Sequence, residues 1–388
     1  MKVRMQWRQC SLVAVAAAAL WAPFLPVSTA AEPVVPTGSA RAAKDDVDWE
    51  RAKALYQREQ QGDRPGGGDR GRRGPVPKAP PATDRTGLVP LDQMAGKDTY
   101  KGEDGGLYGG GKNVPPPEHR KAAQRELAKI APLDSDGKAA GDGKVVLISI
   151  GMSNTTNEFS RFKALADRDA AKWPKLVIVD GAQGGQDAER WSTADRPAWG
   201  RLQERLRRAG VTVRQVQVAW IKHARMGPAR FGEYPKHAEE LVGHVRRSLQ
   251  LARKKFPNLR VAYLSSRIYA GYATTPLNPE PYAYESAFAV RRLILDQVKG
   301  DAALNCDAAK GEVKAPLLLW GPYLWADGLT PRKSDGLVWK REDLAGDGTH
   351  PSGTSGREKV GRLLLNFCKA DANAKGWFGG PSAVVRQR

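Results

Sequence analysis

Three residues of this 388-residue chain have the types and spacing needed for nucleophilic catalysis. Ser153 lies in the tetrapeptide GMSN at positions 151–154, and Asp347 lies three residues before His350 in DGTH at positions 347–350. A carboxylate at that spacing can bind one imidazole nitrogen while the other nitrogen accepts a proton from a serine hydroxyl. The sequence therefore predicts a Ser-His-Asp set, although a serine that caps a helix and a surface histidine are the simpler alternatives.

The elements that must position these residues begin near position 144, where strands and helices start to alternate. Short apolar runs predict strands at 145–150, 176–179, 211–220, 260–265 and 316–320, and helical patterns cover 158–171, 197–209, 236–255, 284–298 and 355–368. Five such units with right-handed crossovers predict an α/β fold, a three-layer α/β/α sandwich with a parallel five-stranded sheet in the order 2-1-3-4-5. Ligands bind at the carboxyl ends of such strands, and Ser153 and Gly184 each follow a predicted strand.

Two regions precede this predicted domain, which covers residues 141–388. Basic residues near the start, an apolar stretch at 11–27 and small residues at 28–30 predict a signal peptide over 1–30, cut after Ala30 or Ala31. The protein is then expected to be exported, periplasmic or extracellular; an uncleaved anchor is the alternative. Residues 31–140 are predicted to be a low-complexity, partly disordered basic extension, with mobility at 62–81 and a Gly-rich loop at 100–117.

Composition narrows the possible partners. The net charge of +20, from 62 basic and 42 acidic residues, suits association with an anionic cell surface, and export argues against nucleic acid. A hydrophobic fraction of 41% excludes disorder throughout, and three cysteines without a CxxC pair argue against a zinc finger. Cys306 and Cys368 remain after the predicted cleavage, either as a disulfide or as two unlinked thiols.

Together and in this order, GMSN and DGTH resemble the blocks of the SGNH (GDSL-like) hydrolase superfamily over roughly residues 144–370. GMSN is similar to the GQSN block of the sialate O-acetylesterase and carbohydrate esterase branch. The resemblance implies that Ser153 is the nucleophile, with Asp347 and His350 as acid and base. It also implies an oxyanion hole from the N–H groups of Ser153 and Gly184, and it requires no cofactor.

One departure from that family concerns the third block, which normally presents an asparagine after the third strand. Lys222 lies nearest that position, either as a substitute oxyanion donor or as a surface residue. Loss of one oxyanion donor typically lowers the rate ~10²–10³-fold. The alternative that this chain is a weakened or non-hydrolytic relative of the superfamily therefore stays open.

A carbohydrate substrate is expected from aromatic and polar residues near the strand ends. Aromatic faces can stack on sugar rings, although core packing is the alternative for each tryptophan. The candidates for substrate binding are Asn154, Trp220, Arg267, Tyr269 and Trp325. His223 either lines the same pocket or lies in the core, and a metal site from Asp347, His350 and Asp327 is disfavoured because no HxxxH or HxH spacing supports it.

The sequence thus favours an exported serine esterase that removes O-acyl groups, most simply O-acetyl, from a carbohydrate. A non-catalytic carbohydrate- or cell-envelope-binding protein that keeps the fold is the second hypothesis. A secreted lipase or phospholipase ranks third, because it would need an apolar acyl groove. The oligomeric state cannot be read from the sequence.

Overall fold

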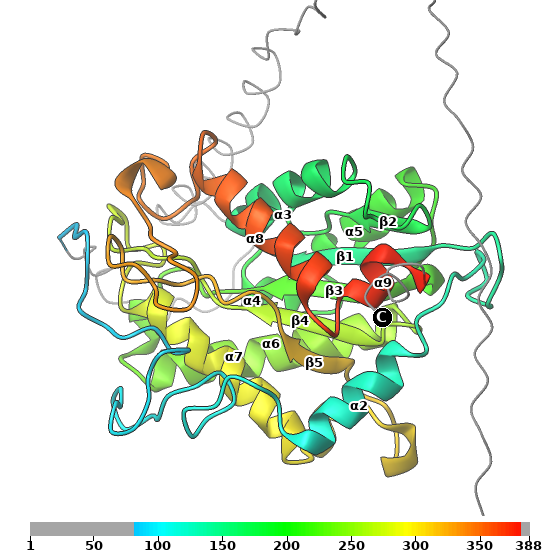
Figure 1. Cartoon of the computed structure of the whole chain (residues 1–388), viewed down its shortest axis with the longest axis horizontal. Helices are drawn as coiled ribbons and strands as arrows, with labels where there is room; N and C mark the ends of the chain where they lie inside the picture. The colour runs from blue at the N-terminus through cyan, green and yellow to red at the C-terminus, as the bar shows by residue number, and fades with distance from the viewer. Residues whose placement is uncertain (1–80, 382–388) are drawn as a thin grey trace, which may run out of the picture.

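A five-stranded, all-parallel sheet in the order β2-β1-β3-β4-β5 forms the centre of the computed structural model, which describes residues 81–381 (Figure 1). The strands are β1 (Val145–Gly151), β2 (Leu176–Val179), β3 (Val216–Lys222), β4 (Val261–Ser265) and β5 (Leu317–Trp320). Their residues are almost all buried, as expected for a parallel sheet that is covered on both faces. The predicted fold class and strand order are confirmed.

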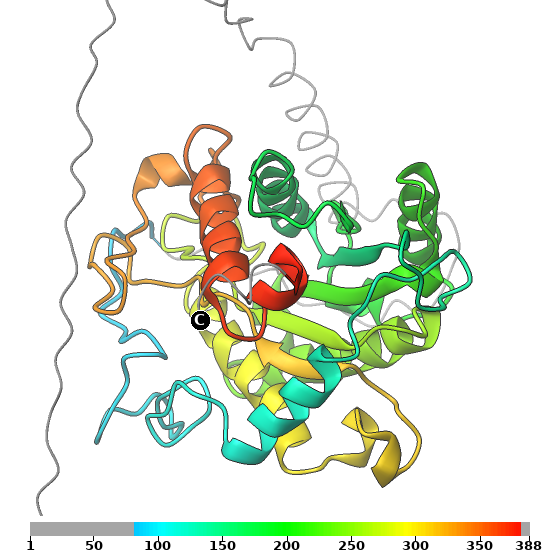
Figure 2. The ribbon, with the colours of Figure 1, turned by 45° about the vertical axis from the view of Figure 1, so that its right-hand side comes forward.

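Helices cover both faces of the sheet (Figure 2). One layer is formed by α3 (Ser153–Ala166) and α8 (Gly356–Ala370), which pack against each other. The opposite layer contains α6 (Lys236–Lys255) and α7 (Tyr282–Val298), with the short α4 (Ala188–Trp191) against α6. Trp199 of α5 (Pro197–Arg208) packs on Trp191 and Phe256.

Several boundaries differ from the sequence-based expectation, and two of these differences bear on the candidate site. The first helix begins at Ser153 and not at Glu158, so the serine is the first helical residue. The third strand runs from Val216 to Lys222, because a short 3₁₀ turn at Val213–Gln215 delays its start. Lys222 is therefore a strand residue, whereas the sequence suggested a position beyond the strand end.

Residues 81–140 belong to the same packed body as the sheet. Leu91 and Met94 are buried in the main core, and the N–H of Thr83 binds the carbonyl of Gly271. The helix α2 (Pro117–Leu127) contacts β4 and β5. Tyr100, in the Gly-rich loop, donates to Glu285 on α7 at 2.5 Å, so this loop is packed on the domain. The packed structure thus includes a segment that lies before the predicted boundary at residue 141.

Several predictions fall outside residues 81–381, namely the signal peptide and all but the end of the tract at 62–81. Within the described range no helix is long and apolar enough to cross a membrane. Cys306 and Cys368 are both free thiols. Of the two alternatives for this pair, the structure contains the unlinked one.

Candidate active site

Ser153 occupies the turn between β1 and α3, at the carboxyl edge of the sheet (Figure 1). Gly151 makes this turn possible, because a Cβ there would lie 2.4 Å from both the Lys222 carbonyl oxygen and Thr155 Oγ1. Thr155 Oγ1 accepts the Met152 N–H at 3.3 Å and donates to the Lys222 carbonyl at 2.8 Å, which fixes the helix start against β3. The first amides of a helix have no intrahelical acceptor and carry a partial positive charge.

The three residues of the predicted set come together at this edge. Ser153 Oγ lies 2.6 Å from His350 Nε2, and His350 Nδ1 lies 2.6 Å from Asp347 Oδ2. Ser153 is half-buried, whereas the imidazole and the carboxylate are almost wholly buried. The predicted contacts among these three side chains are confirmed, although 197 residues separate the serine from the histidine.

The environment of Asp347 keeps its carboxylate ionised. Burial alone would raise its pKa. The hydrogen bond from His350, the nearby imidazole charge and the backbone N–H groups of His350 and Thr349 outweigh that effect and lower the pKa to about 2. An ionised carboxylate at this position fixes the tautomer in which His350 Nε2 can accept a proton.

The loop that carries Asp347 and His350 is held by its backbone. Gly348 adopts a φ of +64°, and a Cβ there would lie 1.7 Å from the Tyr272 carbonyl oxygen. The N–H of Thr274 donates to the Asp347 carbonyl at 3.0 Å, and the Arg267 guanidinium donates to the Thr349 carbonyl at 3.1 Å. These contacts position the loop against the segment that follows β4.

Gly184 lies in the loop after β2. The N–H of the preceding residue, Gln183, donates to the Gly151 carbonyl at 3.1 Å, which brings the loop beside the end of β1. Arg205 binds the carbonyls of Asp180 and Ala182, both at 2.8 Å, and so fixes the loop backbone. Gly184 is exposed, and its N–H donates no hydrogen bond to any residue in the described range. It is therefore available to a ligand.

Lys222 does not occupy either of the places expected for it. Its side chain is fully buried, and its ammonium donates to Glu158 Oε1 of α3 at 2.5 Å. A group without exposed surface, held by a carboxylate, has no access to a substrate carbonyl. Both expectations for Lys222, a substitute oxyanion donor and a surface residue, are wrong, because Lys222 lies within β3 on the face covered by α3.

Four of the five residues predicted to bind substrate are core residues. Each is at most 3% exposed and has a structural partner. Trp220 stacks on Phe159 and donates to Ser265; Tyr269 donates to Thr83; Trp325 donates to Glu280; Arg267 donates to Thr349. All four are therefore buried within the fold and do not form an exposed surface for a substrate.

Asn154, the fifth, remains a candidate. It follows Ser153 directly and is 1% exposed, and neither amide atom has a hydrogen-bond partner within residues 81–381. The structure therefore leaves its amide without a role in the fold.

The structure places two further candidates from the sequence in other surroundings. His223 lies on the other face of the sheet, beside Leu241 and Val245 of α6, and burial lowers its pKa to about 3. Asp327 accepts hydrogen bonds from the backbone and hydroxyl of Thr86 and from the Gly87 N–H. Neither joins the Ser153 constellation.

Two acidic residues that the sequence analysis did not select hold α3 in place. Glu158 is fully buried and pairs with Lys222. Asp180 accepts hydrogen bonds from the hydroxyls of Ser149, Thr156 and Ser160. The spacing of Asn154 and Glu158, four residues apart on the buried face of α3, was the available signal for the first.

Comparison with known proteins adds little to this site. No protein-family model and no curated protein matches the chain. Among solved structures, a candidate acylhydrolase from Bacteroides fragilis is 15% identical with a TM-score of 0.33, covering 64% of this chain and 93% of its own.

Two other solved structures are similar at the same level. A salicylyl-acyltransferase from a tetracycline biosynthetic pathway is 15% identical with a TM-score of 0.33, covering 62% of this chain and 57% of its own. An α/β hydrolase enzyme from the metagenome of Lake Arreo, Spain, is 14% identical with a TM-score of 0.34, covering 62% and 98%. These neighbours carry the names of acylhydrolases, acyltransferases and α/β hydrolases, but similarity at this level establishes neither a family nor an activity for this chain.

Proposed function

We propose that this protein is a serine ester hydrolase in which Ser153 is the nucleophile, His350 the general base and Asp347 the residue that orients it. The observation that carries the proposal is the pair of 2.6 Å contacts, from Ser153 Oγ to His350 Nε2 and from His350 Nδ1 to Asp347 Oδ2. A serine that only capped the helix would not need a histidine held by a buried carboxylate.

In the proposed reaction, Ser153 Oγ attacks the ester carbonyl carbon while His350 Nε2 takes the hydroxyl proton. The N–H groups of Ser153 and Gly184 bind the oxyanion of the tetrahedral intermediate. The intermediate then expels the alcohol, which receives its proton from His350. Water, deprotonated by the same nitrogen, attacks the acyl-enzyme. The second tetrahedral intermediate then breaks its bond to Ser153 Oγ, which takes the proton back from His350 as the carboxylic acid leaves.

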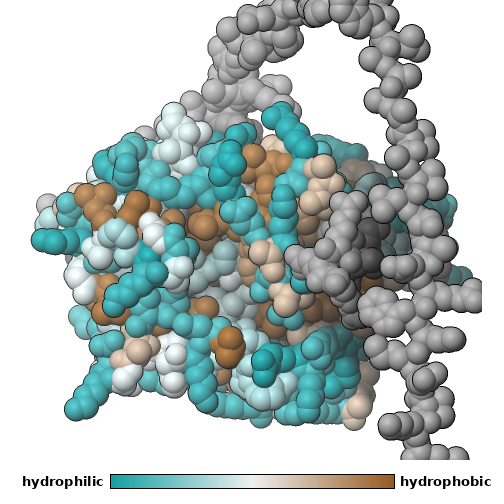
Figure 3. Space-filling view, in the orientation of Figure 1, coloured by the Kyte–Doolittle hydropathy of each residue, from teal (hydrophilic) through white to brown (hydrophobic). Residues whose placement is uncertain are grey.

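The proposed substrate is an O-acylated carbohydrate, met outside the cytoplasm after export. The resemblance of GMSN to the carbohydrate esterase branch and the predicted signal peptide support this proposal. The surface also favours a polar substrate over a lipid. Within residues 81–381 the exposed large hydrophobic residues are Val89, Val114 and Leu329, and the face in Figure 3 is mainly hydrophilic. A lipase would need a larger apolar surface.

A non-catalytic binding protein with the same fold is the competing function. One observation favours the binding protein. Lys222 is buried, so it cannot replace the oxyanion donor that the third block normally supplies. The two hypotheses differ in whether Ser153 is activated.

Labelling with a fluorophosphonate serine probe tests this difference. We expect the full-length protein to be labelled at Ser153, identified by peptide mass, and Ser153→Ala to remain unlabelled. A panel of acetylated sugars and polysaccharides, assayed for acetate release, then tests the substrate class. An unlabelled wild-type protein would favour the binding function.

A further inference from the structure

A buried cluster of three charged side chains adjoins the candidate triad. Glu158 lies on α3, Lys222 at the end of β3, and Arg267 two residues after β4. Each is at most 1% exposed. These are the residue types that are least often found without solvent, so their burial next to a candidate site calls for a cause.

The cluster connects the elements that carry the nucleophile and the base. Lys222 Nζ donates to Glu158 Oε1 at 2.5 Å, which joins β3 to the helix that begins at Ser153. Arg267 Nη2 donates at 3.1 Å to the carbonyl of Thr349, the residue before His350. In addition, the Arg267 charge is attracted by the carboxylates of both Glu158 and Asp347. One contact therefore holds the helix that carries Ser153, and the other holds the loop that carries Asp347 and His350.

Stability alone does not account for this arrangement. A buried ion pair is often no better for stability than an apolar pair of similar volume, because both charges lose their hydration. The effect is visible here, since burial lowers the pKa of Lys222 to about 8 and raises the pKa of Glu158, although each partner's charge opposes the shift of the other. Unlike an apolar contact, however, a charged hydrogen bond fixes direction as well as distance.

We propose that Glu158, Lys222 and Arg267 are positioning residues that hold helix α3 and the loop before His350 in the alignment that lets Ser153 Oγ meet His350 Nε2. This inference rests on the proposed function. It gives Lys222, near the position of the missing third-block asparagine, a role that acts through Glu158 and not through contact with substrate. None of the three is a catalytic residue in this scheme.

The decisive variant replaces the ion pair by apolar side chains of similar length, as Glu158→Leu with Lys222→Met. We expect its melting temperature to equal or exceed that of the wild type. The rate of fluorophosphonate labelling, and kcat for p-nitrophenyl acetate, should fall at least tenfold while KM stays within about twofold. A structural role alone would not move kcat in a protein that is as stable as the wild type.

Single variants separate positioning from folding. Lys222→Met leaves Glu158 buried without its cation, so this variant should lose stability as well as rate. Lys222→Arg keeps a cation that can reach the same carboxylate, and it should recover at least part of the labelling rate. Arg291→Met is the matched control, because Arg291 is a buried cation that binds Glu103 and the Asp104 carbonyl and contacts no residue of the triad. It should label at the wild-type rate per folded molecule.

The outcomes distinguish the two proposals. Wild-type protein that reacts with the probe and an apolar double variant that reacts equally fast would overturn the positioning role and leave the hydrolase intact. If the apolar double variant fails to fold, the single variants decide: a Lys222→Met protein that reacts at least tenfold more slowly per folded molecule than Lys222→Arg would support the role, and equal rates would overturn it. Wild-type protein that does not react at all would overturn the proposed function and this inference with it.

Discussion

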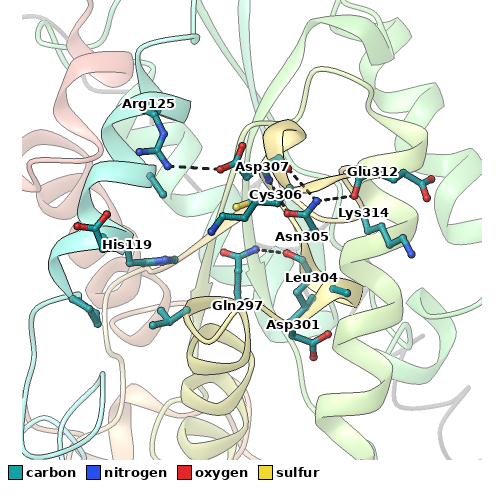
Figure 4. A pocket seen from close by; sticks show the side chains of 17 residues that line it. His119, Arg125, Gln297, Asp301, Leu304, Asn305, Cys306, Asp307, Glu312 and Lys314 are labelled. Atoms are coloured by element: carbon teal, nitrogen blue, oxygen red, sulfur yellow. Dashed lines mark hydrogen bonds and ion pairs between the residues drawn. The ribbon is translucent and has the colours of Figure 1, made fainter.

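Both ends of the sheet carry a histidine near a potential nucleophile, but their surroundings differ. At the carboxyl end Ser153 meets His350. At the opposite end, where α7 finishes and β5 begins, His119 and Cys306 line a cavity of about 320 Å³ (Figure 4). By residue type alone, this second place resembles the start of a cysteine–histidine site.

Hydrogen bonding separates the two places. His119 Nε2 lies 2.8 Å from the Leu318 carbonyl, and burial lowers the pKa of this histidine. Burial also raises the pKa of the Cys306 thiol to about 11, so little thiolate forms near neutral pH. In the same cavity Gln297 binds the Leu304 carbonyl, which closes the loop before β5. A histidine becomes a candidate base when one nitrogen is held by a carboxylate and the other faces a hydroxyl; the histidine at the far end meets neither condition.

The largest expected effect follows from removing the nucleophile or the base. Ser153→Ala and His350→Ala should each lower kcat on the order of 10⁴–10⁶-fold, because the two side chains act as one unit. The double variant should be little worse than either single variant. If the fold-losses in kcat of the two single variants multiply in the double variant, the two side chains do not act as a unit. The proposed contrast between the two ends of the sheet would then be wrong.

Asp347→Asn should cost about 10⁴ in kcat, because the amide favours the wrong tautomer of His350. The same variant has a pH signature. The pKa of Asp347 falls from 3.8 to about 2 on folding, so its ionised form stabilises the fold above about pH 4, and this contribution is lost as the pH falls through 2. The difference in melting temperature between wild type and variant should therefore narrow from pH 4 to pH 2. A constant difference would contradict the assigned role of the carboxylate.

Asn154→Ala tests the one predicted substrate-binding residue whose amide has no hydrogen-bond partner within residues 81–381. We expect kcat/KM to fall roughly 10–10²-fold if the amide binds the ester or its transition state. The melting temperature should change little, because no intramolecular hydrogen bond is lost. A large loss of stability with unchanged kcat/KM would assign Asn154 to the core.

The smallest effect is expected at the far end. Cys306→Ala should leave kcat/KM within twofold of the wild type. In the native protein, alkylation of Cys306 by iodoacetamide at pH 8 should be about 10²-fold slower than that of a cysteine thiol with the ordinary pKa of 9.0. Fast alkylation together with lost activity would remove the distinction drawn between the two ends.

The parts of the structure that local sequence controls were the predictable ones. Apolar runs and helix periods give the five strands, their order and the strand ends where Ser153 and Gly184 lie. The contact between Ser153 and His350 follows from that topology. The fate of Lys222 could not be predicted in this way, because its partner Glu158 lies 64 residues earlier and a charged residue beside a strand end normally indicates solvent.

The expectation that Trp325 and Tyr269 bind a sugar is wrong for a related reason. Trp325 and Tyr269 look exposed when residues 81–140 are treated as an irregular extension. In the structure Tyr269 donates to Thr83, and Tyr284, which packs on Trp325, donates to Val89, so this segment is part of their cover. Gly- and Pro-rich composition shows that a segment lacks regular elements, but it does not show whether the segment is packed.

The backbone at Gly348 restricts which residues can stand between Asp347 and His350, although the catalytic chemistry does not require glycine there. The left-handed backbone and the closeness of the Tyr272 carbonyl exclude every side chain at this position. A library that randomises the codons for residues 348 and 349 and is selected for turnover should therefore return glycine almost without exception at the first position. At the second it should return threonine or serine most often, because the Thr349 hydroxyl donates to the Asp347 carbonyl at 3.4 Å, and other small residues less often, because the shorter contacts with Arg267 and Asp347 run through the Thr349 backbone carbonyl and N–H. The sequence between Asp347 and His350 would then be limited by backbone geometry as much as by catalysis.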